Sequence, residues 1–386
     1  MKNIYLDHAA TCPADPEVLE AMQPYFTEHF GNPSSIYSIS RITRNAIAQA
    51  RQILADAIGA NLEEIVFTSG GSESDNFAIK GVAHALREKG RHIITSQIEH
   101  HAVLYTCKYL EKNGYKVSYL PVDSDGIVRL DELEKTIRRD TILITIMHAN
   151  NEIGSIQPIR EIGEIAKKHK ITVHSDAVQT FGHIPVDVNE LNTDLLSISG
   201  HKFYGPKGVG ALYIRKGTRI TPLIHGGDQE RRRRASTENV PGIVGLGKAV
   251  EIARDVITGE MRRQSGLRDA FIKKILTTIP DSRLNGSTVQ RLPNNINISF
   301  KGIEGESILL NLDMYGIAAS TGSACSSSSL EPSHVLLAIG LDHELAHGSV
   351  RFSLGKHTTA EDLNRVAEIL PGIVRKLRAM SPLYNP

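Results

Sequence analysis

The amino-acid sequence predicts an α/β fold in which a large domain with a mostly parallel central sheet is followed by a smaller C-terminal α+β domain. Short runs of β-branched and apolar residues alternate with segments of helical periodicity through the first two-thirds of the chain. Such alternation is typical of parallel sheets covered by helices on both faces. After about Ile257 longer helical stretches take over, and 386 residues correspond to two or three domains at ~150 residues each.

Seven strands of the large domain are predicted by the apolar runs. They cover residues 64–68, 92–95, 116–120, 141–147, 171–174, 194–199 and 209–214. Between the first two, apolar side chains recur at helical spacing, at Ala78, Val82, Ala85 and Leu86. Ser72 and Asp75 have the spacing of a capping box and Gly90 is a typical stop signal, so we expect a helix that starts at Ser72 and ends before Gly90.

The C-terminal part contains two further apolar runs, residues 295–300 and 349–354, among longer helical stretches. Thr358 and Thr359 precede a last helix of regular apolar spacing. Because proline lacks a backbone N–H, we expect Pro371 to kink that helix or to restart it.

Composition and charge exclude several classes of protein. Hydrophobic residues make up 40% and charged residues 23%, which argues against a disordered chain. The 44 Lys and Arg residues balance 43 Asp and Glu residues, so no long-range field favours nucleic acid or an acidic membrane surface. The start holds no apolar stretch of signal-peptide length, and no run approaches the ~20 residues of a spanning helix. We therefore expect a cytoplasmic protein with no nucleic-acid or membrane partner.

The three cysteines, Cys12, Cys107 and Cys325, are an odd count without C-x-x-C spacing, which argues against a disulfide framework and a structural zinc site. Cys325 lies in the small-residue segment STGSACSSSSLEP. That segment is either a flexible linker with an incidental thiol or a mobile loop that carries a reactive one. Cys12 and Cys107 lie in or beside regular elements and are interpreted as packing thiols.

Three motifs follow predicted strands at their carboxyl ends. TSGGSESDN, residues 68–76, offers free N–H groups at a helix N-terminus, where a phosphate binds readily; the alternative is an ordinary strand–helix turn. HSDAVQ places Asp176 after one strand, and SISGHKFYGPKG places Ser199, His201 and Lys202 after another, although either alone is more often a solvated turn. Together they suit pyridoxal phosphate, because a carboxylate keeps its ring nitrogen protonated and a lysine holds it as a Schiff base.

Further motifs stand in a fixed order along essentially the whole chain: YLDHAAT, EHHAV, NNEIG, HSDAVQ, SGHKFYGPKG, STENV, GSACSSSSLEPSHVL and VRFSLG. In these motifs the sequence resembles the cysteine desulfurases of the NifS and IscS kind, class V aminotransferase-like enzymes of pyridoxal phosphate fold type I. The resemblance implies conversion of L-cysteine to L-alanine, with sulfur carried as a persulfide on Cys325 to acceptors for iron–sulfur cluster assembly. It also implies a large cofactor-binding domain over residues 15–257 and a small domain formed by residues 1–14 and 258–386, with the catalytic cysteine on a loop at about 320–332.

The same resemblance assigns the cofactor site residue by residue. Lys202 becomes the Schiff-base lysine, and Asp176 becomes the partner of the pyridinium nitrogen. Gln179 and Asn151 contact the ring, and Gln179 tunes its phenolic oxygen. The expected phosphate ligands are Gly71, Ser72, Ser199 and His201. Thr237 is expected to reach the phosphate of the neighbouring subunit, which implies a homodimer.

The resemblance also assigns the residues that handle the substrate. His100 stacks on the cofactor ring and can move protons, whereas its neighbour His101 receives no role. Arg351, in VRFSLG, grips the carboxylate of L-cysteine with its bidentate fork, beside Asn151. The alternative for Arg351 is a surface ion pair, which an apolar strand without an acidic neighbour disfavours.

Catalysis is therefore expected from Cys325, Lys202 and His100. No metal of the protein's own is expected. The sulfur acceptor implied is an iron–sulfur scaffold protein of the NifU or IscU type, with which Cys325 can transiently share a nascent cluster.

Three other functions are open. The run HELAH at 343–347 has the zinc spacing of metalloproteases, but Gly340 and Gly348 bracket a segment too short for the required helix. The run of arginines at 231–234 could dock nucleic acid, but no aromatic platform accompanies it. A selenocysteine lyase, or another pyridoxal phosphate-dependent sulfur-cleaving enzyme, is the near alternative, and the Cys325 loop favours desulfuration.

Overall fold

The main element of the computed structural model, which describes residues 3–321, 331–382 and 384, is a seven-stranded sheet. Its strands are β2 (Ile65–Thr68), β3 (His92–Ser96), β4 (Lys116–Leu120), β5 (Thr141–Thr145), β6 (Thr172–Asp176), β7 (Leu195–Ser199) and β8 (Gly210–Ile214). They lie in the order β2-β8-β7-β6-β5-β3-β4, and β8 alone runs against its neighbours. The predicted strands and the mostly parallel sheet are confirmed.

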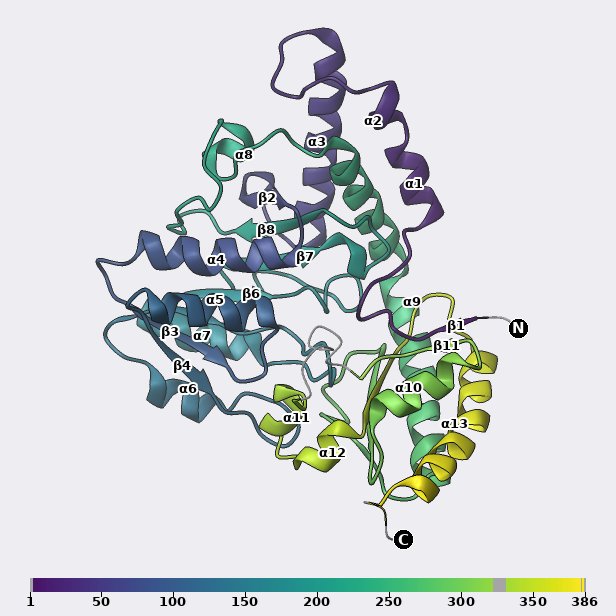
Figure 1. Cartoon of the computed structure of the whole chain (residues 1–386). Coiled ribbons are helices and arrows are strands. Elements are labelled where there is room, and N and C mark those ends of the chain that lie inside the picture. The colour runs from purple at the N-terminus through teal and green to yellow at the C-terminus, as the bar shows by residue number, and fades with distance from the viewer. Residues whose placement is uncertain (1–2, 322–330, 383, 385–386) are drawn as a thin grey trace.

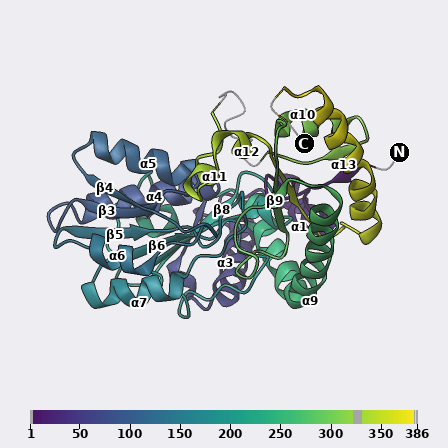
Figure 2. The same ribbon diagram turned by 90° about the horizontal axis from the view of Figure 1, so that it is seen from below.

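Helices cover both faces of this sheet (Figure 2). One face carries α4 (Gly71–Ala85) and α5 (His101–Lys112), and the other carries α3 (Ser38–Ala57), α6 (Leu130–Thr136) and α7 (Ile159–His169). Because strand side chains alternate, Leu143 packs into the core below α4 and α5 while Ile144 packs into the core below α6 and α7. Within the described ranges, no helix combines the length and the apolar character needed to cross a membrane.

A second core lies beyond the large sheet. Its elements are the antiparallel strands β9 (Ser282–Leu284), β10 (Asn295–Phe300) and β12 (Ser349–Ser353), with helices α10 (Gly305–Asp313) and α13 (Ala360–Met380). Residues from the start of the chain join it, because β1 (Ile4–Tyr5) pairs with β11 (Ile317–Ala318) and the side chains of Ile4 and Leu6 pack with Phe352. A smaller α+β unit therefore follows the large one.

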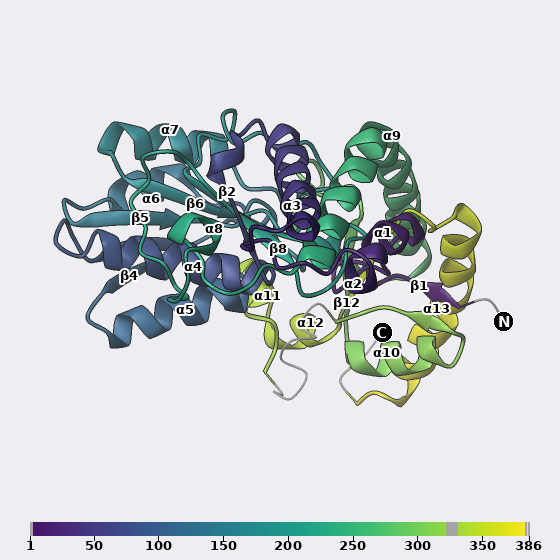
Figure 3. The same ribbon diagram turned by 90° about the horizontal axis from the view of Figure 1, so that it is seen from above.

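The 39-residue helix α9 (Val240–Thr278) connects the two cores. It packs against α3 and α1 (Pro16–Met22) and also against α13 (Figures 1 and 3). The remaining helices are short: α2 (Pro24–Thr27), α8 (Gln229–Arg232), α11 (His334–Ala338), α12 (His343–His347) and the 3-10 turns Leu62–Glu64 and Gly200–Lys202. The position 257 that the sequence suggests as a boundary falls inside α9.

The predicted cap of α4 is wrong, and so is a restart of the last helix at Pro371. Helix α4 begins at Gly71, with Gly70 as its N-cap, so Ser72 does not cap it, and Asp75 is buried on the helix instead of closing a capping box. The turn starts one residue early because Gly70 adopts φ +150°, a conformation that side-chain-bearing residues rarely take. Helix α13 continues through Pro371 without restarting, since its buried face, including Leu370 and Val374, holds it against the second core, and a kink at Pro371 stays a prediction.

Candidate active site

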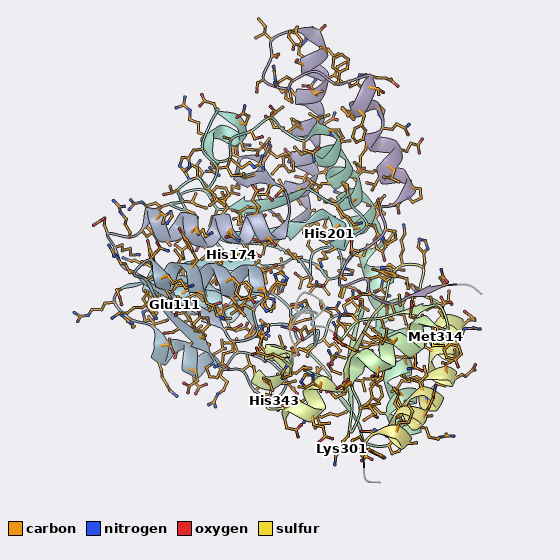
Figure 4. All side chains as sticks on the ribbon, in the orientation of Figure 1. Glu111, His174, His201, Lys301, Met314 and His343 are labelled. Carbon is orange, nitrogen blue, oxygen red and sulfur yellow. The ribbon has the colours of Figure 1, made fainter. Side chains whose placement is uncertain are left out.

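The candidate site lies where the parallel strands of the large sheet end. β2 ends at Thr68 before the α4 turn, β6 ends at Asp176, and β7 ends at Ser199 before the short helical turn that holds His201 and Lys202. Figure 4 shows His174 of β6 at α4, and His201 farther toward α9 and the second core. Carboxyl ends of parallel strands meet at one edge, which is where open α/β sheets bind ligands.

Lys202 reaches the segment that follows β1. Its Nζ donates to the carbonyl of Ala9 at 2.6 Å and to that of Ala10 at 2.8 Å. Gln179 Nε2 donates to the same Ala9 carbonyl at 3.0 Å. The structure therefore brings Lys202 and Gln179 together at one backbone oxygen, and it places the amine of Lys202 at the strand ends as predicted.

Asp176 presents a buried carboxylate at this edge. Its Oδ1 accepts a hydrogen bond from the backbone N–H of Val178 at 2.9 Å. Burial raises the pKa of Asp176 to about 6, and this hydrogen bond and the positive charge of Lys202 act in the opposite direction. A buried carboxylate of this kind is well suited to a protonated ring nitrogen, which would supply a positive charge.

The turn into α4 forms a cradle in which Gly71 has no room for a side chain. A Cβ on Gly71 would lie 2.7 Å from Cγ2 of Val178 and 3.6 Å from Cβ of Ser199. Ser72 follows in the first turn of a 15-residue helix, whose free N–H groups favour an anion. The predicted ligands Gly71, Ser72 and Ser199 therefore lie together, and the cradle fits a phosphate.

His201 lies beside this cradle with its ring Nδ1 3.0 Å from Oγ1 of Thr11. Burial, with the charge of Lys202, lowers the pKa of His201 to about 4, so the imidazole is neutral at physiological pH. His201 can therefore give a hydrogen bond to a phosphate but not a positive charge.

His100 caps the start of α5, where its Nδ1 accepts from the N–H of Ala102 at 3.1 Å. Burial lowers the pKa of His100 to about 4, and the charge of Lys202 adds to this effect. Its imidazole is neutral, and because Nδ1 is an acceptor the ring proton lies on Nε2. This arrangement suits a ring that stacks on a cofactor and exchanges a proton.

Arg351 is buried in β12, and it has an acidic partner. Its Nη2 lies 2.7 Å from Oδ1 of Asp7, and its Nη1 donates to the carbonyl of Asn151 at 2.9 Å. The expectation of no acidic neighbour is therefore wrong, because the backbone bridge between Asp7 and Ser353 brings the start of the chain beside β12. Asn151 meets Arg351 through its backbone, and the predicted contact of its side chain with the ring stays a prediction.

Thr237 lines a cavity of about 210 Å³ with Ser69 and Gly208 of the same chain. Ser69 directly precedes the Gly70 cap of α4, so Thr237 lies near the phosphate cradle of its own chain. Its expected reach to a neighbouring subunit stays a prediction.

Cys325 lies outside the described residues, as does most of the loop expected at 320–332. Ser320, just before this segment, exchanges backbone hydrogen bonds with Arg351. Ser333, just after it, donates from Oγ to Oε2 of Glu152 at 2.5 Å. Both described ends of the cysteine segment are therefore anchored beside the residues that hold Arg351.

The other two thiols are buried, as predicted. Cys12 Sγ lies 3.2 Å from the carbonyl oxygen of Lys202, and burial raises the pKa of Cys12 to about 12. Burial also raises the pKa of Cys107 well above its usual range. Both thiols keep their protons at physiological pH, so neither is a reactive nucleophile.

The structure disfavours two alternative functions. The HELAH run forms only the five-residue α12, and no group of three or more His, Cys, Asp or Glu side chains in the described part of the chain is placed to hold a metal ion. In the arginine run, Arg234 pairs with Glu73 at 2.9 Å and Arg231 donates to the carbonyl oxygen of Leu62. Arg231 and Arg234 therefore make contacts within the chain.

Sequence reasoning missed three acidic residues around the site, Asp7, Asp75 and Glu99. Glu99, next to His100, is buried and accepts from the N–H of Met147 at 3.0 Å. Burial raises the pKa of Glu99 to about 8. In the sequence these three residues stand out only as carboxylates among apolar residues or next to a motif. This pattern does not show which side chains they contact, because the contacts depend on the fold.

Comparisons with known proteins agree with this geometry. The chain matches the family model described as Aminotransferase class-V over residues 4–366. It is 62% identical over 381 residues to a cysteine desulfurase IscS of Dictyoglomus turgidum, which covers 99% of this chain and 97% of that protein. The structure resembles that of a NifS-like protein with a TM-score of 0.92 at 41% identity over 97% of this chain and 100% of the other. It also resembles SspA in complex with cysteine, with a TM-score of 0.82 at 42% identity over 92% of this chain and 100% of that one.

Proposed function

The chain belongs to the class-V aminotransferase family and is a cysteine desulfurase, and from this premise we propose that it converts L-cysteine to L-alanine with pyridoxal phosphate bound at the carboxyl edge of the large sheet. One observation supports this most directly. The Lys202 amine, the buried Asp176 carboxylate and the glycine cradle before α4 lie at the same edge, with Arg351 supplying a guanidinium.

Each part of this edge fits one part of the cofactor. Gly71, Ser72, Ser199 and His201 would hold the phosphate. Asp176 would hold the protonated ring nitrogen, Gln179 and Asn151 would contact the ring, and Lys202 would be the covalent anchor. When bound, pyridoxal phosphate supplies an electron sink for the negative charge that develops at the substrate Cα.

The chain's own groups would position the substrate and move its protons. Arg351 would bind the carboxylate of L-cysteine through the donors of its guanidinium. Lys202 Nζ would take the proton from the Cα of the substrate. His100, neutral and with its proton on Nε2, would stack on the ring and exchange a proton with the bound substrate.

Cys325 would take the sulfur. Its thiolate would attack the sulfur of bound cysteine, so that an S–S bond forms and the substrate Cβ–S bond breaks with its electron pair going to carbon, which protonation completes as alanine. The support is that Cys12 and Cys107 are buried with raised pKa values, and that both described ends of the Cys325 segment are anchored near Arg351. The persulfide would then pass to an iron–sulfur scaffold of the NifU or IscU type.

The quaternary arrangement is proposed with the same enzyme. We propose a homodimer in which Thr237 completes the phosphate site of the partner subunit. We also propose that residues 15–257 act as the cofactor domain and that residues 1–14 and 258–386 form the small domain, since Ile4 and Leu6 pack in the second core.

The test is alanine release from L-cysteine in the presence of a dithiol reductant, with alanine and sulfide measured in equal amounts. Cys325→Ala should keep the visible absorbance of the bound cofactor while alanine release falls at least about a hundredfold, because the acceptor thiol is lost. Cys107→Ala, which removes a buried thiol in α5, is the matched control and should retain turnover. Retained alanine release by Cys325→Ala would overturn the assignment of the sulfur acceptor.

A further inference from the structure

Asp75, which the sequence pattern assigned to a helix cap, lies instead in the interior next to the cofactor site. It is buried on the face of α4 that packs on β5, β6 and β7. The side chain of Ser197 on β7 interacts with it and lowers its pKa, against the effect of burial. Its Oδ1 lies 3.6 Å from Nε2 of His174 and has no hydrogen-bond partner among the described residues.

These side chains form one buried polar row alongside Asp176. His174 and Asp176 are two residues apart on β6, so their side chains leave the same face of the sheet, and Ser197 is the register partner of Asp176 on β7. Ser197 Oγ lies 3.0 Å from Nε2 of His174, whose Nδ1 lies 2.8 Å from Oγ1 of Thr145. The row thus reaches from Asp75 across three strands of the sheet.

His174 cannot neutralise Asp75. Burial lowers the pKa of His174 to about 3, so its imidazole is uncharged at physiological pH. The contact between Asp75 and His174 is therefore no ion pair. Asp75 has acidic neighbours instead, because the charges of Asp176 and Glu99 both act on it.

Two buried carboxylates whose charges act on each other do not both stay ionised, because each charge opposes the other in a low dielectric. Asp176 is the better place for the single charge, since it accepts from the N–H of Val178 and is favoured by the positive charge of Lys202. Asp75 has its Oδ1 without a donor. Burial and then the charge of Asp176 raise the pKa of Asp75 well above its usual range.

We propose that Asp75 is a positioning residue that holds a proton: as a neutral carboxylic acid it hydrogen-bonds Ser197 and leaves Asp176 as the ionised carboxylate that meets the ring nitrogen of the cofactor. If the proton lay on Asp176, that residue would give the ring nitrogen no negative charge. The inference rests on the proposed function for the identity of the ring nitrogen, whereas the position of the proton is a property of the chain itself.

Infrared spectroscopy of the holoenzyme labelled with carboxyl-¹³C aspartate tests where the proton lies. We expect a carbonyl band of a protonated aspartic acid at pH 7 that is lost in Asp75→Asn and retained in Asp255→Asn, a control on the exposed surface of α9. Retention of the band in Asp75→Asn overturns the proposal. The band is also measured without cofactor, so the result does not depend on whether the enzyme releases alanine.

A second measurement separates positioning from simple folding. Asparagine resembles a neutral, hydrogen-bonding carboxylic acid, so Asp75→Asn should keep kcat within about threefold and leave the pH midpoint of the cofactor absorbance unchanged. Asp75→Ala lacks the donor, and kcat should fall at least about tenfold with KM for cysteine unchanged. A midpoint shift of one unit or more in Asp75→Asn would show that the wild-type residue is ionised and would overturn the proposal.

Discussion

Oδ1 of Asp7 lies 2.7 Å from Nη2 of Arg351, although the two residues are 344 positions apart in the chain. Nη1 of the same guanidinium donates to the carbonyl of Asn151, and its Nε has no partner within the described ranges. The group proposed to bind the substrate carboxylate is thus already paired with a carboxylate of the chain. A bound carboxylate must share the guanidinium with Asp7 or replace it.

Asp7→Asn should therefore strengthen substrate binding and weaken the fold. Removing the competing charge should lower the KM for L-cysteine several-fold with kcat little changed. It should also lower the unfolding free energy by about 2 kcal/mol, because a buried guanidinium loses its charged partner. Steady-state kinetics and urea unfolding measure the two effects. A raised KM would show instead that Asp7 orients Arg351 for the substrate.

Arg351→Gln is the complementary variant. It removes charge-assisted hydrogen bonds to the substrate carboxylate, each worth about 1.5–3 kcal/mol, so the KM should rise by about ten- to a hundredfold. The same change in Arg283, an exposed arginine on β9, is the control and should leave KM unchanged. An unchanged KM in Arg351→Gln would exclude its proposed role.

Most of the strand framework was predictable because each strand is a local run of β-branched residues with clear turns between runs. The placement of Asp176 and Lys202 followed as well, since ends of parallel strands share an edge. The ion pair of Asp7 was not predictable, because it depends on a bridge between the two ends of the chain. Asp75 was misplaced for a local reason: Gly70 starts α4 early and turns the carboxylate toward the sheet.

Lys202→Ala should abolish covalent attachment of the cofactor. Reduction of the wild-type holoenzyme with borohydride should fix the cofactor to the peptide that contains Lys202, and mass spectrometry should find no such adduct in the variant. Alanine release should fall at least about a thousandfold, because both the anchor and the base are lost. Lys207→Ala, an exposed lysine in the same loop, should behave like wild type. An adduct on another lysine in Lys202→Ala would contradict the assignment.

Glu99 should make stability depend on pH. Burial raises its pKa from 4.5 to about 8 in the folded state, so the folded chain binds one more proton than the unfolded chain between these values. The stability that comes with the protonated side chain is therefore complete below pH 4.5, falls as the pH rises above 4.5, and is lost once the pH has risen through 8. From pH 6 to pH 8 this loss is about 2 kcal/mol, at ~1.4 kcal/mol per pH unit.

Glu99→Gln removes this titration. Urea unfolding at pH 6 and pH 8 gives the free energy of unfolding of both proteins. The value for the variant minus the value for wild type should be about 2 kcal/mol larger at pH 8 than at pH 6, because wild type alone loses stability. Glu111→Gln, on the exposed side of α5, is the control and should show a constant difference. A constant difference for Glu99→Gln as well would mean that Glu99 is already ionised at pH 6.

The position of Thr237 allows two arrangements that a subunit-mixing experiment separates. Thr237 lies near the cradle of its own chain, on a cavity shared with Ser69, yet the proposed dimer directs it to the partner's phosphate. Thr237→Ala alone should weaken cofactor binding by about tenfold or more, the cost of one hydrogen bond to a charged group.

In a heterodimer of Thr237→Ala with Lys202→Ala chains, purified with two different tags, one site keeps both Lys202 and a partner threonine. Activity at limiting cofactor should then recover to about half of wild type. If Thr237 acts within its own chain, the only subunit with Lys202 lacks its threonine, and no recovery occurs.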